Sequence, residues 1–190
     1  MRFRWTQRHR PIQWSSVFKS PLGHTHISDV GRSLSSDQPD RQHQILEALL
    51  ISAWQNGSPR IGDVAEMRRT VTATDIERFT EISGDRNPLH YDLEAARASR
   101  FGEIVVQGGV TSAILNAVVA EQLPGPGTVF LNVNWNFTAP VRPGDTITGR
   151  VEVIDVRSDK PITTLRTTVT RDDGTVALEG TAVCYTMAIH

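Results

Sequence analysis

The segment Val110–Leu123 constrains the fold of this chain more than any other part of the sequence. It reads VTSAILNAVVAEQL and is apolar on nearly every face of a helix as far as Glu121. An α-helix with this pattern is buried around most of its circumference. It is also shorter than the ~20 apolar residues that a membrane-spanning helix needs. Other elements of the same domain must therefore wrap around it.

The chain after this helix is rich in strand signals that supply such a wrapper. Residues 128–137 alternate apolar with polar side chains, which predicts a strand with one buried face. Three later segments are rich in Val, Ile and Thr, and Asp172-Asp173-Gly174 indicates a hairpin turn between the last two. With a short strand near Glu66–Val71, they predict an α+β fold in which roughly four or five antiparallel strands surround the helix. The buried set of the first strand is Val129, Leu131, Val133, Trp135 and Phe137, and the later segments are Thr146–Val156, Ile162–Arg171 and Val176–Met187.

Two shorter helices are predicted before the central one. Thr74 and Glu77 have the spacing of a capping box, and Gly84 supplies a left-handed end for the helix that they begin. Asp92–Arg100 is predicted as the second short helix, with Asp92 as its N-cap. The first helix therefore ends directly before Asp85.

Residues 1–59 are predicted to be an N-terminal extension, and residues 60–190 the folded domain. The first forty residues are rich in arginine and serine, poor in acids and without a hydrophobic period, which is typical of disorder. The same composition resembles an organelle transit peptide, and a start codon assigned too far upstream is another alternative. Gln42–Gln55 is predicted as a short helix. His24 and His26 lack a nearby third ligand, so we predict no zinc site there.

The charge balance and cysteine content limit the partners of the protein. Its 20 basic and 21 acidic residues give a formal net charge of -1, so no overall field attracts nucleic acid or an anionic membrane. Cys184 is the single cysteine, which excludes an intrachain disulfide and is compatible with a reducing cytosol. We expect a cytoplasmic protein, with organelle targeting through the N-terminal segment as the alternative.

One loop places a carboxylate and an imidazole close together. It reads SGDRNPLH over residues 83–90. Pro88 fixes its own φ and favours an extended Asn87, so Asp85 and His90 can converge on one point. An acid and an imidazole there can handle one water molecule, which suits the addition of water to an activated double bond. The alternative is an ordinary turn in which the Asn87 side chain bonds to the backbone.

A pair of glycines precedes the central helix. Because Gly108 and Gly109 have no side chains, a substrate carbonyl can approach the free amide groups of the first helical turn. Such amides can stabilise an oxyanion. The structural alternative is that both glycines only make the turn into the helix.

These segments together resemble the MaoC-like, or (R)-specific enoyl-CoA hydratase, family of hot-dog proteins. The resemblance covers roughly Arg60 to Met187. It rests on SGDRNPLHYD (83–92), IVVQGG (104–109), LPGPGT (123–128) and FTAPVRPGDTI (137–147), which occur in this order. It implies a hot-dog fold, in which an antiparallel sheet wraps around the long central helix. It also implies a homodimer or a higher assembly of dimers, and no metal or redox cofactor.

The resemblance further implies an activity and a role for each site residue. The reaction is the reversible syn addition of water to a trans-2-enoyl-CoA thioester, or the dehydration of the (R)-3-hydroxyacyl partner. Asp85 would be the general base on the water, and His90 would exchange a proton with the substrate α-carbon. Asn87 would hold the loop or the water. The Gly108 amide, beside Gly109, would bind the thioester oxygen.

Two polar residues near these glycines are further candidates for the site. Gln107, a candidate for binding the thioester, stands where many family members have histidine. It can still donate hydrogen bonds to the substrate, but unlike histidine it cannot become cationic. Asn116, about two turns into the central helix, either points a polar group at the site or is a buried amide satisfied by a neighbouring strand.

Two other functions remain open from the sequence. A hot-dog acyl-CoA thioesterase would share the fold and direct an activated water at the carbonyl, although the D-x-N-P-x-H spacing argues against it. A non-catalytic acyl-thioester-binding subunit of a larger complex would not need both Asp85 and His90.

Overall fold

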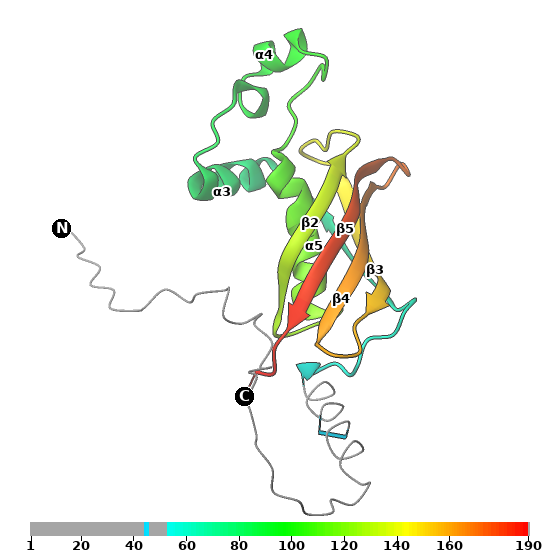
Figure 1. The fold of residues 1–190 in the computed structure, drawn as a ribbon. Coiled ribbons are helices and arrows are strands. Elements are labelled where there is room, and N and C mark those ends of the chain that lie inside the picture. Colours follow the sequence, from blue (N-terminus) through cyan, green and yellow to red (C-terminus); the bar gives the residue numbers. More distant parts are fainter. Residues whose placement is uncertain (1–43, 46–52, 190) are drawn as a thin grey trace, which may run out of the picture. The chain divides into compact units, whose positions relative to one another are not determined.

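A computed structural model describes residues 44–45 and 53–189 of the chain. Within this part, five strands form one antiparallel sheet in the order β1-β3-β4-β5-β2, so β1 and β2 are its edges (Figure 1). The predicted hairpin turn joins β4 to β5. No helix in the described ranges is long and apolar enough to cross a membrane. The strands are β1 (Val64–Thr70), β2 (Thr128–Phe137), β3 (Thr146–Val156), β4 (Ile162–Arg171) and β5 (Val176–Thr186).

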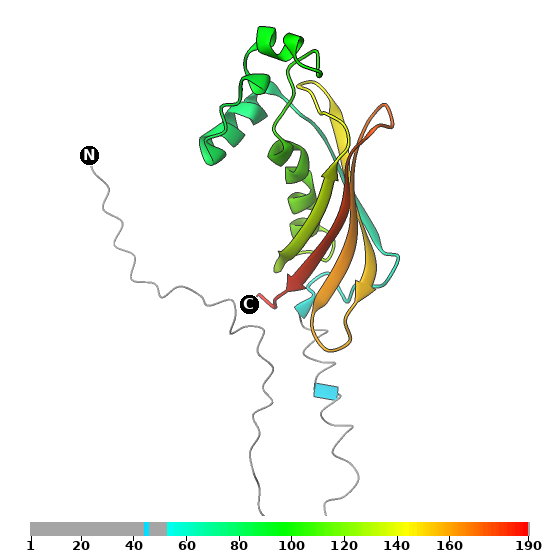
Figure 2. The ribbon, with the colours of Figure 1, turned by 45° about the horizontal axis from the view of Figure 1, so that its top comes forward.

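The central helix α5 (Gly108–Glu121) lies along the face of the sheet that curves around it (Figures 1 and 2). Leu115 and Val118 are fully buried in the core between helix and sheet. The sheet and helix therefore have the hot-dog arrangement that was expected. The burial of α5 is less complete than its sequence predicts, because Ala113 and Asn116 are exposed within this chain.

A β-bulge in β2 changes which of its residues face the core. Phe130 pairs with Cys184, and the next pair is shifted by one residue, which leaves Leu131 without a partner in the register. One extra residue reverses the alternation of side chains. Phe130 and Trp135 consequently both pack against the core, with ring centroids 5.8 Å apart in an edge-to-face contact. The predicted burial of Leu131 is therefore wrong, and its exposed fraction is 37 %. Val133 and Phe137 on the same edge strand were also predicted to be buried, and they are 41 % and 54 % exposed within this chain.

Helix α3 (Ala73–Ser83) has Thr72 rather than Thr74 as its N-cap. The Asp75 carboxylate accepts hydrogen bonds from the Thr72 amide at 2.8 Å and from the Thr72 hydroxyl at 2.9 Å. Asp75 also forms an ion pair with Arg69 of β1. The sequence contains two overlapping threonine–acid pairs with capping-box spacing. Arg69, six residues before Asp75 at the end of β1, forms its ion pair with the acid of the first pair.

Short elements follow α3 and form an overhang near the beginning of α5 (Figures 1 and 2). Gly84 ends α3 in the left-handed region at φ 76°, as predicted. The 3₁₀ turn η1 (Pro88–His90) comes next, followed by α4 (Leu93–Ala98). Asp92 caps α4 as predicted, because its side chain accepts hydrogen bonds from the first amides of that helix.

The chain directly before residue 60 contacts the folded domain. Trp54 is only 5 % exposed. Asn56 Nδ2 donates to the Gln122 carbonyl at 3.1 Å, and Gln55 Nε2 donates to the Ile189 carbonyl at 2.9 Å. Packing on the domain therefore begins before the boundary placed at residue 60. Most of the predicted helix 42–55, and the pair His24 and His26, lie outside the described residues.

Candidate active site

The loop after α3 brings the predicted carboxylate and imidazole together. Asp85 Oδ2 lies 3.6 Å from His90 Nε2. The Asn87 amide donates to Asp85 Oδ1 at 3.0 Å, and the Leu89 amide donates to Asn87 Oδ1 at 3.1 Å. Asn87 therefore shapes the loop through backbone hydrogen bonds, and the second oxygen of Asp85 faces His90.

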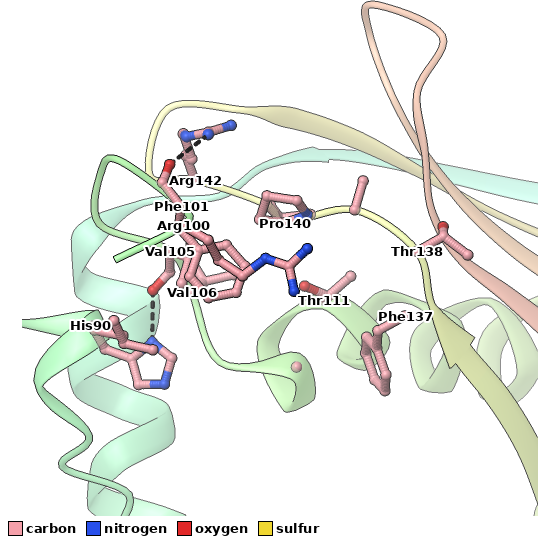
Figure 3. A pocket seen from close by; sticks show the side chains of 14 residues that line it. His90, Arg100, Phe101, Val105, Val106, Thr111, Phe137, Thr138, Pro140 and Arg142 are labelled. Carbon is pink, nitrogen blue, oxygen red and sulfur yellow. Dashed lines mark hydrogen bonds between the residues drawn. The ribbon is translucent and has the colours of Figure 1, made fainter. Parts of the chain in front are cut away.

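His90 is held in a defined protonation pattern by a main-chain acceptor. Its Nδ1 lies 2.7 Å from the Val105 carbonyl oxygen (Figure 3). A carbonyl can only accept a hydrogen bond, so Nδ1 carries a proton and Nε2 is the nitrogen that faces Asp85. The side chain of His90 is 10 % exposed and that of Asp85 40 %. The imidazole is thus fixed in position, while water can reach the carboxylate.

A cavity of about 700 Å³ opens beside His90. This volume lies in the usual range for small-molecule sites. Its walls include Gly108 and Thr111 of α5 and Phe137 at the end of β2 (Figure 3). The cavity therefore joins the imidazole of the loop to the first turn of the central helix.

The two glycines of α5 have different surroundings. Gly108 lines the cavity, and the amides of a first helical turn have no acceptor within their helix. A Cβ at Gly108 would lie 3.2 Å from the Phe137 ring, whereas a Cβ at Gly109 would lie 2.1 Å from the Phe79 ring. Gly108 is thus suited to bind an oxyanion. Gly109 is needed so that α3 can pack closely on α5.

The side chains of Gln107 and Asn116 lie away from the cavity lining. Gln107 is 2 % exposed and its Nε2 donates to Thr80 Oγ1 of α3 at 3.0 Å. This placement corrects the expectation that the Gln107 side chain contacts the substrate. Asn116 is exposed on α5, so within this chain it is neither a buried amide nor part of the cavity wall.

Two arginines lie at the cavity, and the sequence analysis identified neither Arg100 nor Arg142 as a site residue. Arg142 forms an ion pair with Glu103 at 3.0 Å. Arg100 extends over the cavity (Figure 3), and no acid within residues 53–189 pairs with it. Arg100 lies two residues past the end of α4, where the sequence gives no local sign that its side chain reaches the cavity. Val105 was missed because it acts through its backbone. No cluster of three or more potential metal ligands occurs in the described part of the chain.

A sheet wrapped around α5, with an Asp–His pair near the amino end of that helix, defines a hot-dog protein with an acid–base site. The family model of the MaoC-like domain matches residues 58–175, which is more than half of the chain. The chain therefore belongs to the MaoC-like family.

Individual relatives agree with this assignment. The chain is 35 % identical over 126 residues to the (R)-specific enoyl-CoA hydratase of Aeromonas caviae. This alignment covers 66 % of this chain and 94 % of the relative. It is 34 % identical over 123 residues to the 3-hydroxybutyryl-CoA dehydratase of Methylorubrum extorquens, covering 65 % of this chain and 78 % of the relative. The solved structure of the A. caviae (R)-hydratase superposes with a TM-score of 0.65 at 34 % identity, over 67 % of this chain and 97 % of that one. The expected hot-dog fold is confirmed.

Proposed function

We propose that this protein is a hydro-lyase that adds water reversibly, with syn geometry, to trans-2-enoyl-CoA thioesters. The observation that carries the proposal is the 3.6 Å approach of Asp85 to His90, where His90 lines the same cavity as Gly108. Acid–base groups and an oxyanion site are what addition of water to an activated alkene requires. The names of the similar hydratase and dehydratase support the same reaction class.

We propose one task for each group. The substrate thioester oxygen accepts a hydrogen bond from the Gly108 amide, which stabilises the enolate. Asp85 takes a proton from water while the water oxygen bonds to the β-carbon, and the electrons of the double bond move toward the thioester. For this step His90 begins the cycle with a proton on Nε2 as well as on Nδ1, and the α-carbon takes the Nε2 proton, which leaves a neutral imidazole. Transfer of the proton from Asp85 to Nε2 across the 3.6 Å gap restores the starting state.

We further propose that the reaction needs no metal or redox cofactor. Addition of water moves protons but leaves the net oxidation state of the substrate unchanged, and the side chains above supply the proton transfers. Coenzyme A enters only as part of the substrate. Activity that survives exhaustive dialysis against a chelator is the expected result, and loss of activity that added metal restores would contradict it.

Two substitutions in the loop test the reaction. Asp85→Asn and His90→Gln should each lower kcat for crotonyl-CoA hydration by about 10²–10⁴, because positioned acid–base groups contribute that much. Loss of enoyl absorbance and release of free thiol are followed in parallel, with circular dichroism to show that each variant is folded. Hydration by both variants within a few-fold of the wild type would refute the proposed roles. Thiol release as the main activity would favour a thioesterase.

We also propose a homodimer formed through β2. This strand is a sheet edge, and Val133 on it is 41 % exposed. An unpaired edge with apolar side chains can pair with a second copy across a twofold axis. Val133→Lys should reduce the mass in sedimentation from that of a dimer to that of a monomer. Val64→Lys, on the opposite edge strand and 45 % exposed, is the matched control that should stay dimeric. A monomeric wild type, or equal effects of both variants, would refute the proposal.

A cytoplasmic location is proposed for the protein, with organelle targeting through the N-terminal segment as the alternative. A fusion of residues 1–59 to a fluorescent protein tests this in a cell with mitochondria. Diffuse fluorescence supports the cytoplasm, and import supports a transit peptide.

A further inference from the structure

A buried threonine hydroxyl lies between the loop that carries Asp85 and His90 and the segment that leads to Gly108 of α5. Thr80, in the last part of α3, is 5 % exposed. Its Oγ1 donates to the Asp85 carbonyl oxygen at 2.7 Å. The same oxygen accepts hydrogen bonds from Gln107 Nε2 at 3.0 Å and from the Tyr91 hydroxyl. One side chain thus contacts three segments that meet at the active site.

The hydrogen-bonding capacity of a hydroxyl fixes the direction of these bonds. A threonine hydroxyl has one proton and two lone pairs. The Asp85 carbonyl can only accept, so the proton of Thr80 is used there. Both lone pairs then accept from Gln107 and Tyr91. The Gln107 amide must consequently present its NH₂ group, and no group without a hydroxyl can replace Thr80.

Each partner of Thr80 belongs to, or directly adjoins, a group used in catalysis. The carbonyl that Thr80 binds is that of Asp85 itself. Tyr91 directly follows His90, and Gln107 directly precedes Gly108. The Gln107 carbonyl also accepts the amide of Val110 at 3.0 Å in the first turn of α5. The hydrogen bonds of Thr80 therefore link the acid–base loop to the oxyanion end of the helix.

The Gln107 side chain carries an oxygen that has no partner. Its Oε1 is buried and makes no hydrogen bond within the described residues. A buried polar atom without a partner is destabilising, so an apolar residue of similar size would cost less at this position. The presence of a glutamine at position 107 is explained if its NH₂ group is needed for the hydrogen bond to Thr80.

From this arrangement we propose that Thr80, with Gln107 and Tyr91, positions the Asp85–His90 loop against the Gly108 amide, and that this sets kcat. The inference rests on the proposed function. None of the three side chains needs to touch the substrate, so they are positioning residues. Their loss displaces groups that must be aligned closely in the transition state, and small displacements of this kind can lower rates by about a hundredfold.

Thr80→Val, Thr80→Ser and Thr74→Val test the hydroxyl. Valine keeps the shape of threonine without the hydroxyl, serine keeps the hydroxyl, and Thr74 is an exposed threonine on the same helix. Steady-state hydration of crotonyl-CoA is measured for each folded variant. Thr80→Val should lower kcat about ten- to hundredfold while KM changes less than about threefold. Thr80→Ser and Thr74→Val should retain kcat within about threefold.

Gln107→Leu separates positioning from stability. It removes both the donor to Thr80 and the unpartnered Oε1. Activity should fall about tenfold or more, whereas the midpoint of urea unfolding should stay the same or rise. Because Gln107 and Thr80 act through one hydroxyl, the double variant Thr80→Val/Gln107→Leu should lose less than the product of the two single effects.

Three results would overturn the inference. The first is a Thr80→Val protein as active as Thr74→Val beside an active wild type. The second is an equal loss in Thr80→Val and Thr80→Ser, which indicates packing instead of the hydroxyl. The third is a fall in activity of Gln107→Leu that matches its fall in stability. A folded wild type that hydrates no enoyl thioester would refute the proposed function itself, and the inference with it.

Discussion

Alanine substitutions at Gly108 and Gly109 should differ in their effect on stability although the two residues are adjacent. At Gly109 a Cβ would lie 2.1 Å from the Phe79 ring, so the ring must retreat by at least about 1.3 Å to reach the 3.4 Å of an ordinary contact. Overpacking of this kind costs about 1–3 kcal/mol. Alanine offsets up to ~1 kcal/mol of this through its higher helix propensity.

At Gly108 the same change is sterically milder. The Cβ would meet the Phe137 ring at 3.2 Å, which a shift of a few tenths of an ångström relieves. The free energy of unfolding should therefore change by less than about 1 kcal/mol. The added methyl group, however, stands in the cavity wall beside the amide that receives the thioester oxygen. We expect kcat/KM to fall about tenfold or more.

Urea unfolding followed by circular dichroism and crotonyl-CoA hydration are measured on both variants. Gly109→Ala should lose stability and activity together, because Phe79 belongs to the helix that leads to Asp85. Phe79→Leu in the same protein should recover part of the lost stability. Gly108→Ala should lose activity alone. Equal loss of stability in the two variants, or full activity in Gly108→Ala, would refute the division of roles between the glycines.

Three further predictions concern groups outside the reacting pair. Burial raises the pKa of Asp75, but hydrogen bonds from Thr72 and the charge of Arg69 outweigh this effect and hold the pKa below its usual value. Its stabilising effect is therefore present above the ordinary carboxyl pKa of about 3.9 and is lost as the pH falls through the lowered folded-state value. Asp75→Ala should cost about 1–2 kcal/mol in urea unfolding near pH 7 and progressively less toward low pH, and a difference that is independent of pH would contradict this. Burial raises the pKa of Cys184 to about 12, so a maleimide should label it only in urea, and rapid labelling of the folded protein is the contrary outcome. Arg100 lies at the cavity, and we predict that it binds a phosphate of coenzyme A. Arg100→Ala should then raise KM for crotonyl-CoA about tenfold, with no change for the phosphate-free pantetheine thioester, and equal effects on both substrates would exclude that contact.

The elements of the fold could be predicted where the pattern is local. The apolar pattern of Val110–Leu123 required a cover, and the Asp92 cap and the Gly84 stop follow from residue chemistry near each position. Errors occurred where contacts between different elements decide. The bulge at Leu131 depends on how β2 pairs with β5, and the acid that pairs with Thr72 at the start of α3 also forms an ion pair with Arg69 of β1.

The same distinction between local patterns and contacts between segments applies to the candidate site. The spacing of Asp85 and His90 and the glycine before the helix were visible in the sequence. The direction in which a side chain points was not visible in the sequence. Gln107 was therefore expected to face the substrate, although it faces α3. Thr80 and Val105 were missed for a related reason, because their partners lie outside their own segments and include main-chain oxygens, which every residue possesses.

The bond between His90 and the Val105 carbonyl also separates chemistry from selectivity. The acceptor belongs to the peptide backbone, whereas the Val105 side chain forms part of the cavity wall. Replacing valine by a smaller or larger apolar residue can reshape the space for the acyl chain while the histidine keeps its partner. Position 105 is therefore a place where substrate range can diverge without a new proton-transfer apparatus.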